Sequence, residues 1–172
     1  PLIFRAYDIR GKVGTDLTPE IAELIGKAYG TYIQKIEGKD IAVGRDNRLS
    51  SQQLQESLIK GLLSTGCNVI NIGLSLSPML YFSVAKWKLS GGVNITGSHN
   101  PTDYNGFKMT MKDAAPIAEE EIQEIRRLME GGVFIEGKGN LEEKEIKSEY
   151  FDFLRNKIKL SGKIKVVVDA GN

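Results

Sequence analysis

A serine and the chain's single histidine lie side by side in the segment TGSHNP, residues 96–101, directly after an apolar stretch. If that stretch is a strand of an α/β layer, Ser98 follows its carboxyl end, where such folds bind ligands. Gly97 allows a tight turn and the close approach of a bulky group, and Pro101 restricts the loop that follows. On this pattern Ser98 is a nucleophile, a phosphate acceptor or an ordinary loop residue.

An acyl hydrolase is not indicated by this serine. The segment lacks the second glycine of G-x-S-x-G, and the chain has no second histidine to act as a base. His99 adjoins Ser98, and neighbouring side chains on an extended backbone point apart, which argues against a Ser-His-Asp triad. His99 is therefore either a loop residue or a donor to a phosphate oxygen.

Two basic residues are candidates to neutralise a phosphoryl group near Ser98. Lys108 follows ten residues later, on a strand that returns toward the loop, although on its own it also fits a solvated surface lysine. Arg10 stands in YDIRG, before a glycine, and arginine binds phosphate through two parallel hydrogen bonds.

A second basic segment, GRDNRLSS, follows another predicted strand and precedes a helix. Arg45 and Arg48 could bind an anion there, but we favour an ion pair of Asp46 with Arg48 that braces the loops. Neither segment is a Walker loop, because G-x-x-x-x-G-K-[ST] is absent from the sequence.

The composition restricts the class of protein. The 172 residues are 41% hydrophobic and 26% charged, with a net charge of +1, so neither nucleic-acid binding nor membrane binding is indicated. The single cysteine, Cys67, cannot form an intrachain disulfide, and one cysteine with one histidine cannot build a Cys/His metal cluster. The first residues lack a signal-peptide pattern, so we expect a cytoplasmic protein.

Strands and helices alternate along most of the chain, which predicts an α/β fold: a three-layer α/β/α domain with a mixed, mostly parallel sheet. Thr18 and Pro19 begin a helix, a second begins at Ser50 or Ser51, and a third spans about 77–88, with Ala85 among its inward residues. Segments 41–46, 68–73 and 91–96 read as strands. The segment NGFKMTM, entered by an Asn-Gly turn, follows too soon for a helical crossover and should run antiparallel.

The composition changes from Gly131 onward, where glycine and charged residues dominate. A helix is predicted over about 142–159, followed by a strand in GKIKVVVDAGN and an Asp-Ala-Gly-Asn turn. We therefore expect one domain over residues 1–140, and over 141–172 the linking helix and first strand of a second domain.

Five segments resemble the α-D-phosphohexomutase family, in its order and approximate spacing, across the whole chain. They are YDIRG, GRDNRLSS, SPMLYFS, TGSHNPTDYNGFK and VVVDAGN. The chain is most similar to the bacterial phosphomannomutase/phosphoglucomutase branch, and the phosphoglucosamine branch shares the Ser-His-Asn-Pro core. The resemblance implies four domains around a cleft, of which this chain matches the first and the start of the second.

The resemblance also implies the chemistry. Ser98 would carry a phosphoryl group, exchange it with O1 or O6 of a hexose phosphate through a 1,6-bisphosphate, and contribute one Mg²⁺ ligand through its phosphate. Lys108 and Arg10 match the family's active-site cations, Tyr7 its substrate-contacting segment, and His99 a neighbour of the phosphoserine. Glucose 1,6-bisphosphate would act as activator. The other metal ligands belong to domains outside this chain, so the isolated chain should be inactive. A non-catalytic sugar-phosphate-binding module is the alternative.

Overall fold

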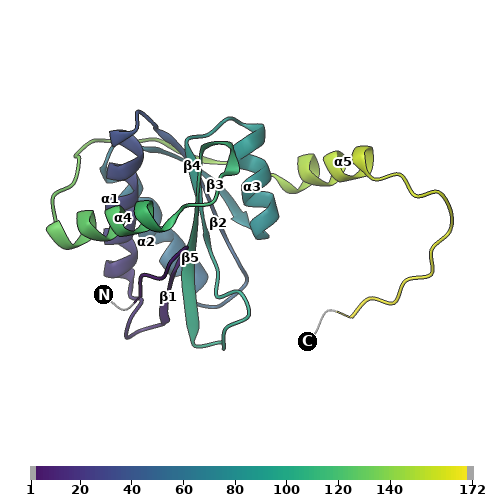
Figure 1. The fold of residues 1–172 in the computed structure, drawn as a ribbon, viewed down its shortest axis with the longest axis horizontal. Helices are drawn as coiled ribbons and strands as arrows, with labels where there is room; N and C mark the ends of the chain where they lie inside the picture. The colour runs from purple at the N-terminus through teal and green to yellow at the C-terminus, as the bar shows by residue number, and fades with distance from the viewer. Residues whose placement is uncertain (1–2, 170–172) are drawn as a thin grey trace.

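The computed structural model describes residues 3–169, and its centre is one mixed sheet of six strands (Figure 1). Their order across the sheet is β1-β5-β4-β2-β3-β6. Strands β2, β3, β4 and β6 run parallel, whereas β5 is antiparallel to both β4 and β1. The strands are β1 Ile9–Lys12, β2 Asp40–Arg45, β3 Asn68–Leu74, β4 Gly91–Ile95, β5 Tyr104–Met111 and β6 Leu141–Glu143. The predicted α/β class and the antiparallel return are confirmed.

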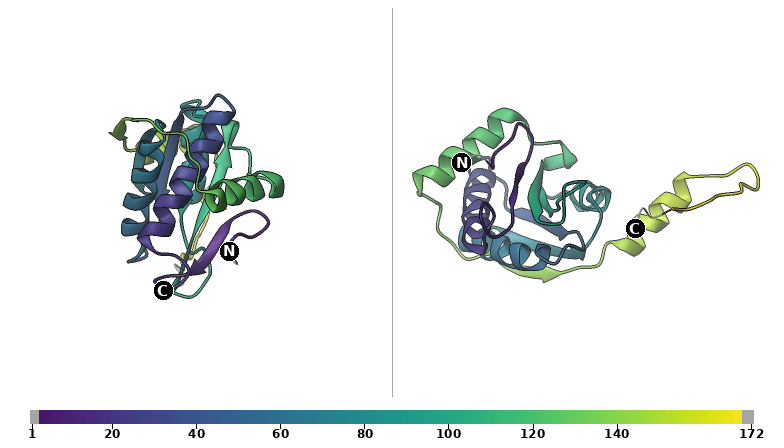
Figure 2. Two further views of the ribbon diagram at one scale, coloured as in Figure 1. Left: turned by 90° about the vertical axis from the view of Figure 1, so that its left-hand side faces the viewer. Right: turned by 90° about the horizontal axis from the view of Figure 1, so that it is seen from below.

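Helices cover both faces of the sheet, which gives the predicted three layers (Figures 1 and 2). One face packs against α1, α2 and α4, and the other against α3 and the short helix η1. In the described part of the chain, no helix is long and apolar enough to cross a membrane. The helices are α1 Pro19–Lys35, α2 Ser51–Ser64, α3 Ser77–Lys86, η1 Lys112–Ala114, α4 Glu119–Gly131 and α5 Lys147–Lys157.

The central strand β2 shows why two cores form. Successive side chains of a strand point to opposite faces. Ile41 and Val43 join the large core beneath α1, α2 and α4, whereas Ala42 lies in the smaller core with Leu80 and Val84 of α3. Both faces of β2 are therefore buried, as expected for a strand covered by helices on each side.

The helix starts follow the sequence signals only in part. Thr18 caps α1 as predicted, since its hydroxyl accepts a hydrogen bond from the Ile21 N–H at 3.3 Å. Ser50 occupies the cap position of α2 but makes no capping bond. In α3 the prediction that Ala85 faces inward is wrong, because Ser83 and Val84 complete the buried stripe and Ala85 falls on the solvent side.

The C-terminal part differs most from the prediction. Residues 141–143 pair with β3 as the edge strand β6, so α5 begins at Lys147 rather than near residue 142. Beyond Ile158 no strand forms up to Asp169, and Val166, Val167 and Val168 are exposed. The predicted strand is therefore absent from the described residues, because no neighbouring strand is there to accept its backbone hydrogen bonds. Most of the predicted Asp-Ala-Gly-Asn turn lies outside the described residues.

Candidate functional site

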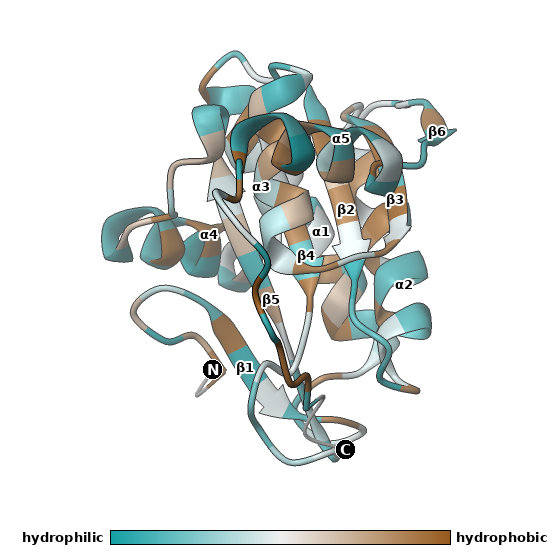
Figure 3. Ribbon diagram, turned by 90° about the vertical axis from the view of Figure 1, so that its right-hand side faces the viewer, coloured by the Kyte–Doolittle hydropathy of each residue, from teal (hydrophilic) through white to brown (hydrophobic). Residues whose placement is uncertain are grey.

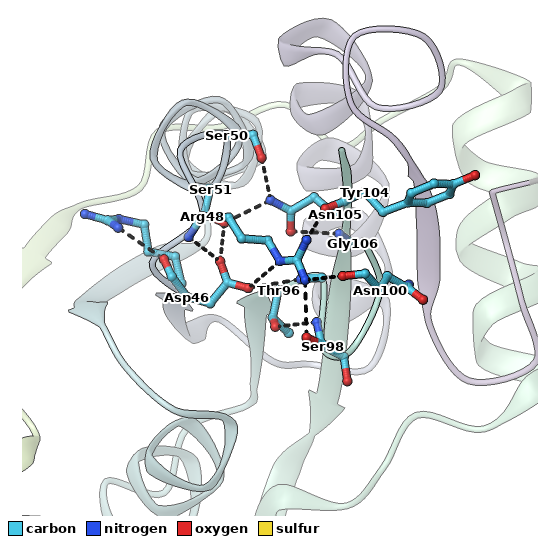
Figure 4. A network of polar contacts seen from close by, with 12 residues as sticks. Asp46, Arg48, Ser50, Ser51, Thr96, Ser98, Asn100, Tyr104, Asn105 and Gly106 are labelled. Atoms are coloured by element: carbon cyan, nitrogen blue, oxygen red, sulfur yellow. Dashed lines mark hydrogen bonds and ion pairs between the residues drawn. The ribbon is translucent and has the colours of Figure 1, made fainter. Parts of the chain in front are cut away.

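The serine loop, defined as residues 96–103, connects β4 to β5 at the carboxyl edge of the parallel strands. The segment 46–50, which connects β2 to α2, leaves the sheet at the same edge because β2 and β4 are parallel neighbours. The topology thus brings the two polar segments together, and Figure 4 shows their side chains interleaved.

Arg48 is at the centre of the contacts between these segments. Its guanidinium donates hydrogen bonds to the carbonyl oxygens of Ser98 at 3.3 Å, Asn100 at 2.6 Å, Pro101 at 2.6 Å and Tyr104 at 3.0 Å. A Cβ atom on Gly97 would lie only 2.2 Å from Cζ of Arg48. The bulky group that Gly97 was expected to admit is therefore the arginine side chain of this same chain.

Asp46 ties Arg48 to the serine loop. Its Oδ2 lies 3.3 Å from Nε of Arg48 and accepts a hydrogen bond from the Gly97 N–H at 3.0 Å, while Oδ1 accepts from the Ser51 hydroxyl at 2.5 Å. Burial by itself would raise the pKa of Asp46, but these hydrogen bonds, with others from Arg48 and Thr96, leave that pKa below its usual value. The predicted bracing pair of Asp46 and Arg48 is confirmed.

Ser98 is exposed on this braced loop and has a left-handed backbone, with φ of 53°. Its N–H donates to Oγ1 of Thr96 at 2.9 Å, and its Oγ lies 3.2 Å from Nδ1 of His99. The expectation that the Ser98 and His99 side chains diverge is wrong, because it assumed an extended backbone. Among the described residues no hydrogen bond joins His99 to a carboxylate, so these residues form no Ser-His-Asp triad.

Arg10 is anchored beside the serine loop. In the β1–β5 pairing Arg10 lies opposite Gly106, and a Cβ atom on Gly106 would lie 2.7 Å from Cδ of Arg10. The Arg10 side chain thus passes over Gly106, where its guanidinium donates to the Thr96 carbonyl and pairs with Asp8 at 2.8 Å. The Arg10 guanidinium is therefore held at the carbonyl of Thr96, which is two residues before Ser98 in the chain.

Lys108 and Tyr7 are not in contact with Ser98 in this structure. Lys108 is exposed at the middle of β5, opposite Asn94, and its ammonium lies 5.6 Å from the centre of the Tyr81 ring on α3. Tyr7 precedes β1 and is 69% exposed. The lysine has four rotatable methylene groups with which to reach a group bound at the loop, whereas Tyr7 faces open solvent.

The serine loop forms one wall of a cleft of about 720 Å³. Thr96 and Ser98 line it from the serine loop, and Asn47, Arg48 and Ser50 line it from the segment before α2. A phosphate or sugar-sized group can therefore approach the Ser98 hydroxyl from this side.

A metal site is not assembled by the described residues alone. Among them, no group of three or more histidine, cysteine, aspartate or glutamate side chains is placed to hold a metal ion. Asp46, beside the serine loop, already accepts hydrogen bonds on both carboxylate oxygens. The described residues thus do not fit an Mg²⁺ site without ligands from elsewhere.

Asn105 is a structural contributor that sequence reasoning missed. The Asn-Gly pair was expected to form a turn, but both residues lie within β5. The Asn105 side chain is buried and donates to the hydroxyls of Ser50 and Ser51 at 2.8 and 2.9 Å. The serine pair at the start of α2 was the available signal, since Ser50 makes its polar contact here instead of capping the helix.

Comparison with known proteins places these features in one family. Residues 1–136 match the family model described as phosphoglucomutase/phosphomannomutase, alpha/beta/alpha domain I. A phosphoglucomutase of Neisseria meningitidis is 45% identical over 99% of this chain and 37% of its own length. A phosphomannomutase/phosphoglucomutase of Pseudomonas aeruginosa is 44% identical over 99% of this chain and 36% of its own. A crystal structure of a phosphoglucomutase/phosphomannomutase family protein from Burkholderia thailandensis superposes with a TM-score of 0.88 at 34% identity, covering 93% of this chain and 36% of that one.

Proposed function

Because the chain belongs to the phosphoglucomutase/phosphomannomutase family, we propose that it is the phosphoserine-bearing part of a phosphohexomutase, with Ser98 as the phosphoryl carrier. The observation that carries the proposal is an exposed Ser98 on a loop that is braced from beneath and opens onto a cleft. The chain spans only 36–37% of the length of the relatives named above, so the mutase activity is proposed for it together with the remaining domains.

The proposed reaction moves one phosphoryl group and returns another. A hydroxyl at O1 or O6 of a hexose phosphate attacks the phosphorus of phosphorylated Ser98, the new O–P bond forms, and the bond to Oγ breaks. The hydroxyl proton leaves at the same step, and Lys108 is our candidate to carry it. The 1,6-bisphosphate then reorients, and its other phosphoryl group returns to Ser98, so the net change is the position of the phosphate.

Charge neutralisation defines the roles of the basic residues. A phosphoserine carries about −1.5 to −2 charge near neutral pH, and transfer spreads charge over the phosphoryl oxygens. Arg10 is anchored at the Thr96 carbonyl, close to that charge. Lys108 reaches it by swinging away from Tyr81. His99, adjacent to the Ser98 hydroxyl, donates to a phosphate oxygen, and the exposed Tyr7 contacts substrate.

Two small molecules complete the proposal. Mg²⁺, bound through the Ser98 phosphate and by ligands from the remaining domains, would neutralise phosphoryl charge when present. Glucose 1,6-bisphosphate would serve as activator, because it can phosphorylate a free Ser98. The names of the relatives favour glucose and mannose phosphates over the phosphoglucosamine branch. The cytoplasmic location and the inactivity of the isolated chain stay predictions. The domain boundary after residue 140 is also still a prediction, and β6, which begins just after it, pairs with β3 of the preceding sheet.

Intact-mass measurement on the full-length protein tests Ser98 as the carrier. After incubation with glucose 1,6-bisphosphate and Mg²⁺, the wild type should gain one phosphoryl group, and Ser98→Ala should gain none and lose mutase activity by about 1,000-fold or more. Ser161→Ala, at an exposed serine of the C-terminal segment, is the matched control and should behave as wild type. A wild type that binds hexose phosphates but never becomes phosphorylated would instead favour the non-catalytic binding module.

A further inference from the structure

We infer that Arg48 is the positioning residue of the serine loop: it sets the direction of the Ser98 hydroxyl for transfer without contacting substrate. The inference rests on the proposed function, and it assigns a role to a residue of the GRDNRLSS segment that the reaction does not use. Its basis is the set of contacts drawn in Figure 4.

The contacts of Arg48 span the whole serine loop. The carbonyl of Ser98 belongs to the start of the loop, those of Asn100 and Pro101 to its middle, and that of Tyr104 to the first residue of β5. A single planar guanidinium therefore fixes both ends of the loop relative to each other. A lysine at this position would offer one compact ammonium and could not satisfy four separate carbonyls in one plane.

No part of the Arg48 guanidinium remains for an anion. One terminal nitrogen donates to Pro101 and Tyr104, the other to Ser98 and Asn100, and Nε faces Asp46 at 3.3 Å. Arg48 borders the cleft, but its side chain is only 16% exposed and all its N–H groups already have partners. Arg48 therefore differs in its role from Arg10 and Lys108, which are proposed to interact with the phosphoryl group itself.

Gly97 and Asp46, which contact Arg48, both accommodate its guanidinium. Gly97 leaves room for the guanidinium, since any Cβ would overlap Cζ. Asp46 holds Nε of Arg48 with the same oxygen that accepts the Gly97 N–H. The left-handed backbone of Ser98 lies directly after Gly97, so this set of contacts holds the backbone position from which its Oγ projects.

The test compares Arg48→Lys with the matched control Arg127→Lys in the full-length protein. Arg127 pairs with Glu124 on the exposed side of α4 at 2.8 Å, so the control makes the same chemical change away from the loop. Since misplacement of a reacting group by about 1 Å can cost about 100-fold in rate, we expect Arg48→Lys to lower kcat by about tenfold to 100-fold. KM should stay within about twofold, because Arg48 does not bind substrate.

Two further measurements separate positioning from a merely structural role. The rate at which glucose 1,6-bisphosphate phosphorylates Ser98 should fall in parallel with kcat, at temperatures well below unfolding. Amide hydrogen exchange at Gly97 and Ser98 should accelerate in Arg48→Lys and not in Arg127→Lys. If Arg48→Lys does not fold, Gly97→Ala makes the same test, because its methyl group displaces the guanidinium from the opposite side.

The outcomes distinguish this inference from the proposed function. A folded Arg48→Lys variant with kcat within about twofold of wild type would overturn the inference and leave Ser98 as the carrier, as would a Gly97→Ala variant with normal kcat. A wild type that never phosphorylates Ser98 would overturn the proposed function. If Ser98 is never phosphorylated, amide exchange still tests Arg48. Unchanged exchange at Gly97 and Ser98 in Arg48→Lys would overturn the inference as well. Accelerated exchange would show that Arg48 holds the serine loop, without a role in transfer.

Discussion

The serine loop and the C-terminal segment, residues 158–169, both lie on the surface and both lack regular secondary structure. In the serine loop, however, Arg48 and Asp46, from a neighbouring segment, form hydrogen bonds with backbone groups. The C-terminal segment contains a run of hydrophobic residues (Figure 3) but extends away from the sheet (Figure 1). Its valine and isoleucine side chains are exposed. A polar loop thus has its backbone groups hydrogen-bonded from within the chain, whereas the apolar side chains of the C-terminal segment are not buried in the described structure.

The largest effect that tests this comparison is on stability. Ile25 of α1 is fully buried in the main core, and Val167 is 91% exposed. Ile25→Ala should lower the free energy of unfolding by about 2–5 kcal/mol, because it leaves a cavity. Val167→Ala should change it by less than about 0.5 kcal/mol. Urea unfolding of the chain measures both, and a loss above about 1 kcal/mol for Val167→Ala would mean that the C-terminal segment packs in solution.

The same contrast explains which features could be predicted from sequence. The start of α1 and the antiparallel β5 depend on local signals, namely a capping threonine and a connection too short for a crossover. Strand β6 was missed because Leu141–Glu143 is short, exposed and charged, and becomes a strand only by pairing with β3. The predicted strand near Val167 has the right composition but no neighbour among the described residues.

The candidate site divides in the same way. Ser98 and the Asp46–Arg48 pair could be proposed from residue type and spacing at strand ends. The four carbonyl contacts of Arg48 could not, because they depend on how the serine loop turns in space. The approach of His99 to Ser98 was missed for a related reason: serine has no strong preference for the left-handed conformation that brings the side chains together.

A smaller effect concerns the charge of Asp46. Asp46→Asn should destabilise the chain by about 1–3 kcal/mol at neutral pH, since a carboxylate that accepts several hydrogen bonds is lost. The pKa of Asp46 is lowered on folding, so its contribution is present above the unfolded value of about 3.9 and is lost as the pH falls through the folded value. The difference between wild type and variant should therefore shrink below about pH 4, as followed by urea unfolding at several pH values.

The control for Asp46 lies in α5, next to the C-terminal segment. Asp152 pairs with Arg155 at 3.2 Å, and both side chains are more than half exposed. Asp152→Asn should change the free energy of unfolding by less than about 0.5 kcal/mol at neutral pH. If Asp46→Asn and Asp152→Asn lowered the free energy of unfolding equally, the partly buried Asp46 carboxylate would not be what stabilises the serine loop.

The smallest effect compares two serines, one in each region. Ser98 has φ of 53°, a backbone conformation that costs a residue with a Cβ about 1–2 kcal/mol. Glycine adopts this conformation without strain, but its more flexible unfolded chain lowers the free energy of unfolding by about 0.5–1 kcal/mol. Ser98→Gly should therefore be more stable than Ser98→Ala, by up to about 1 kcal/mol. Ser161 is exposed and is not among the residues with positive φ, so Ser161→Gly should be equal to Ser161→Ala or slightly less stable. Urea unfolding of the four variants gives the two differences directly. A Ser98→Ala variant as stable as Ser98→Gly would mean that the loop does not hold Ser98 in the left-handed conformation, and the brace would then not direct its hydroxyl.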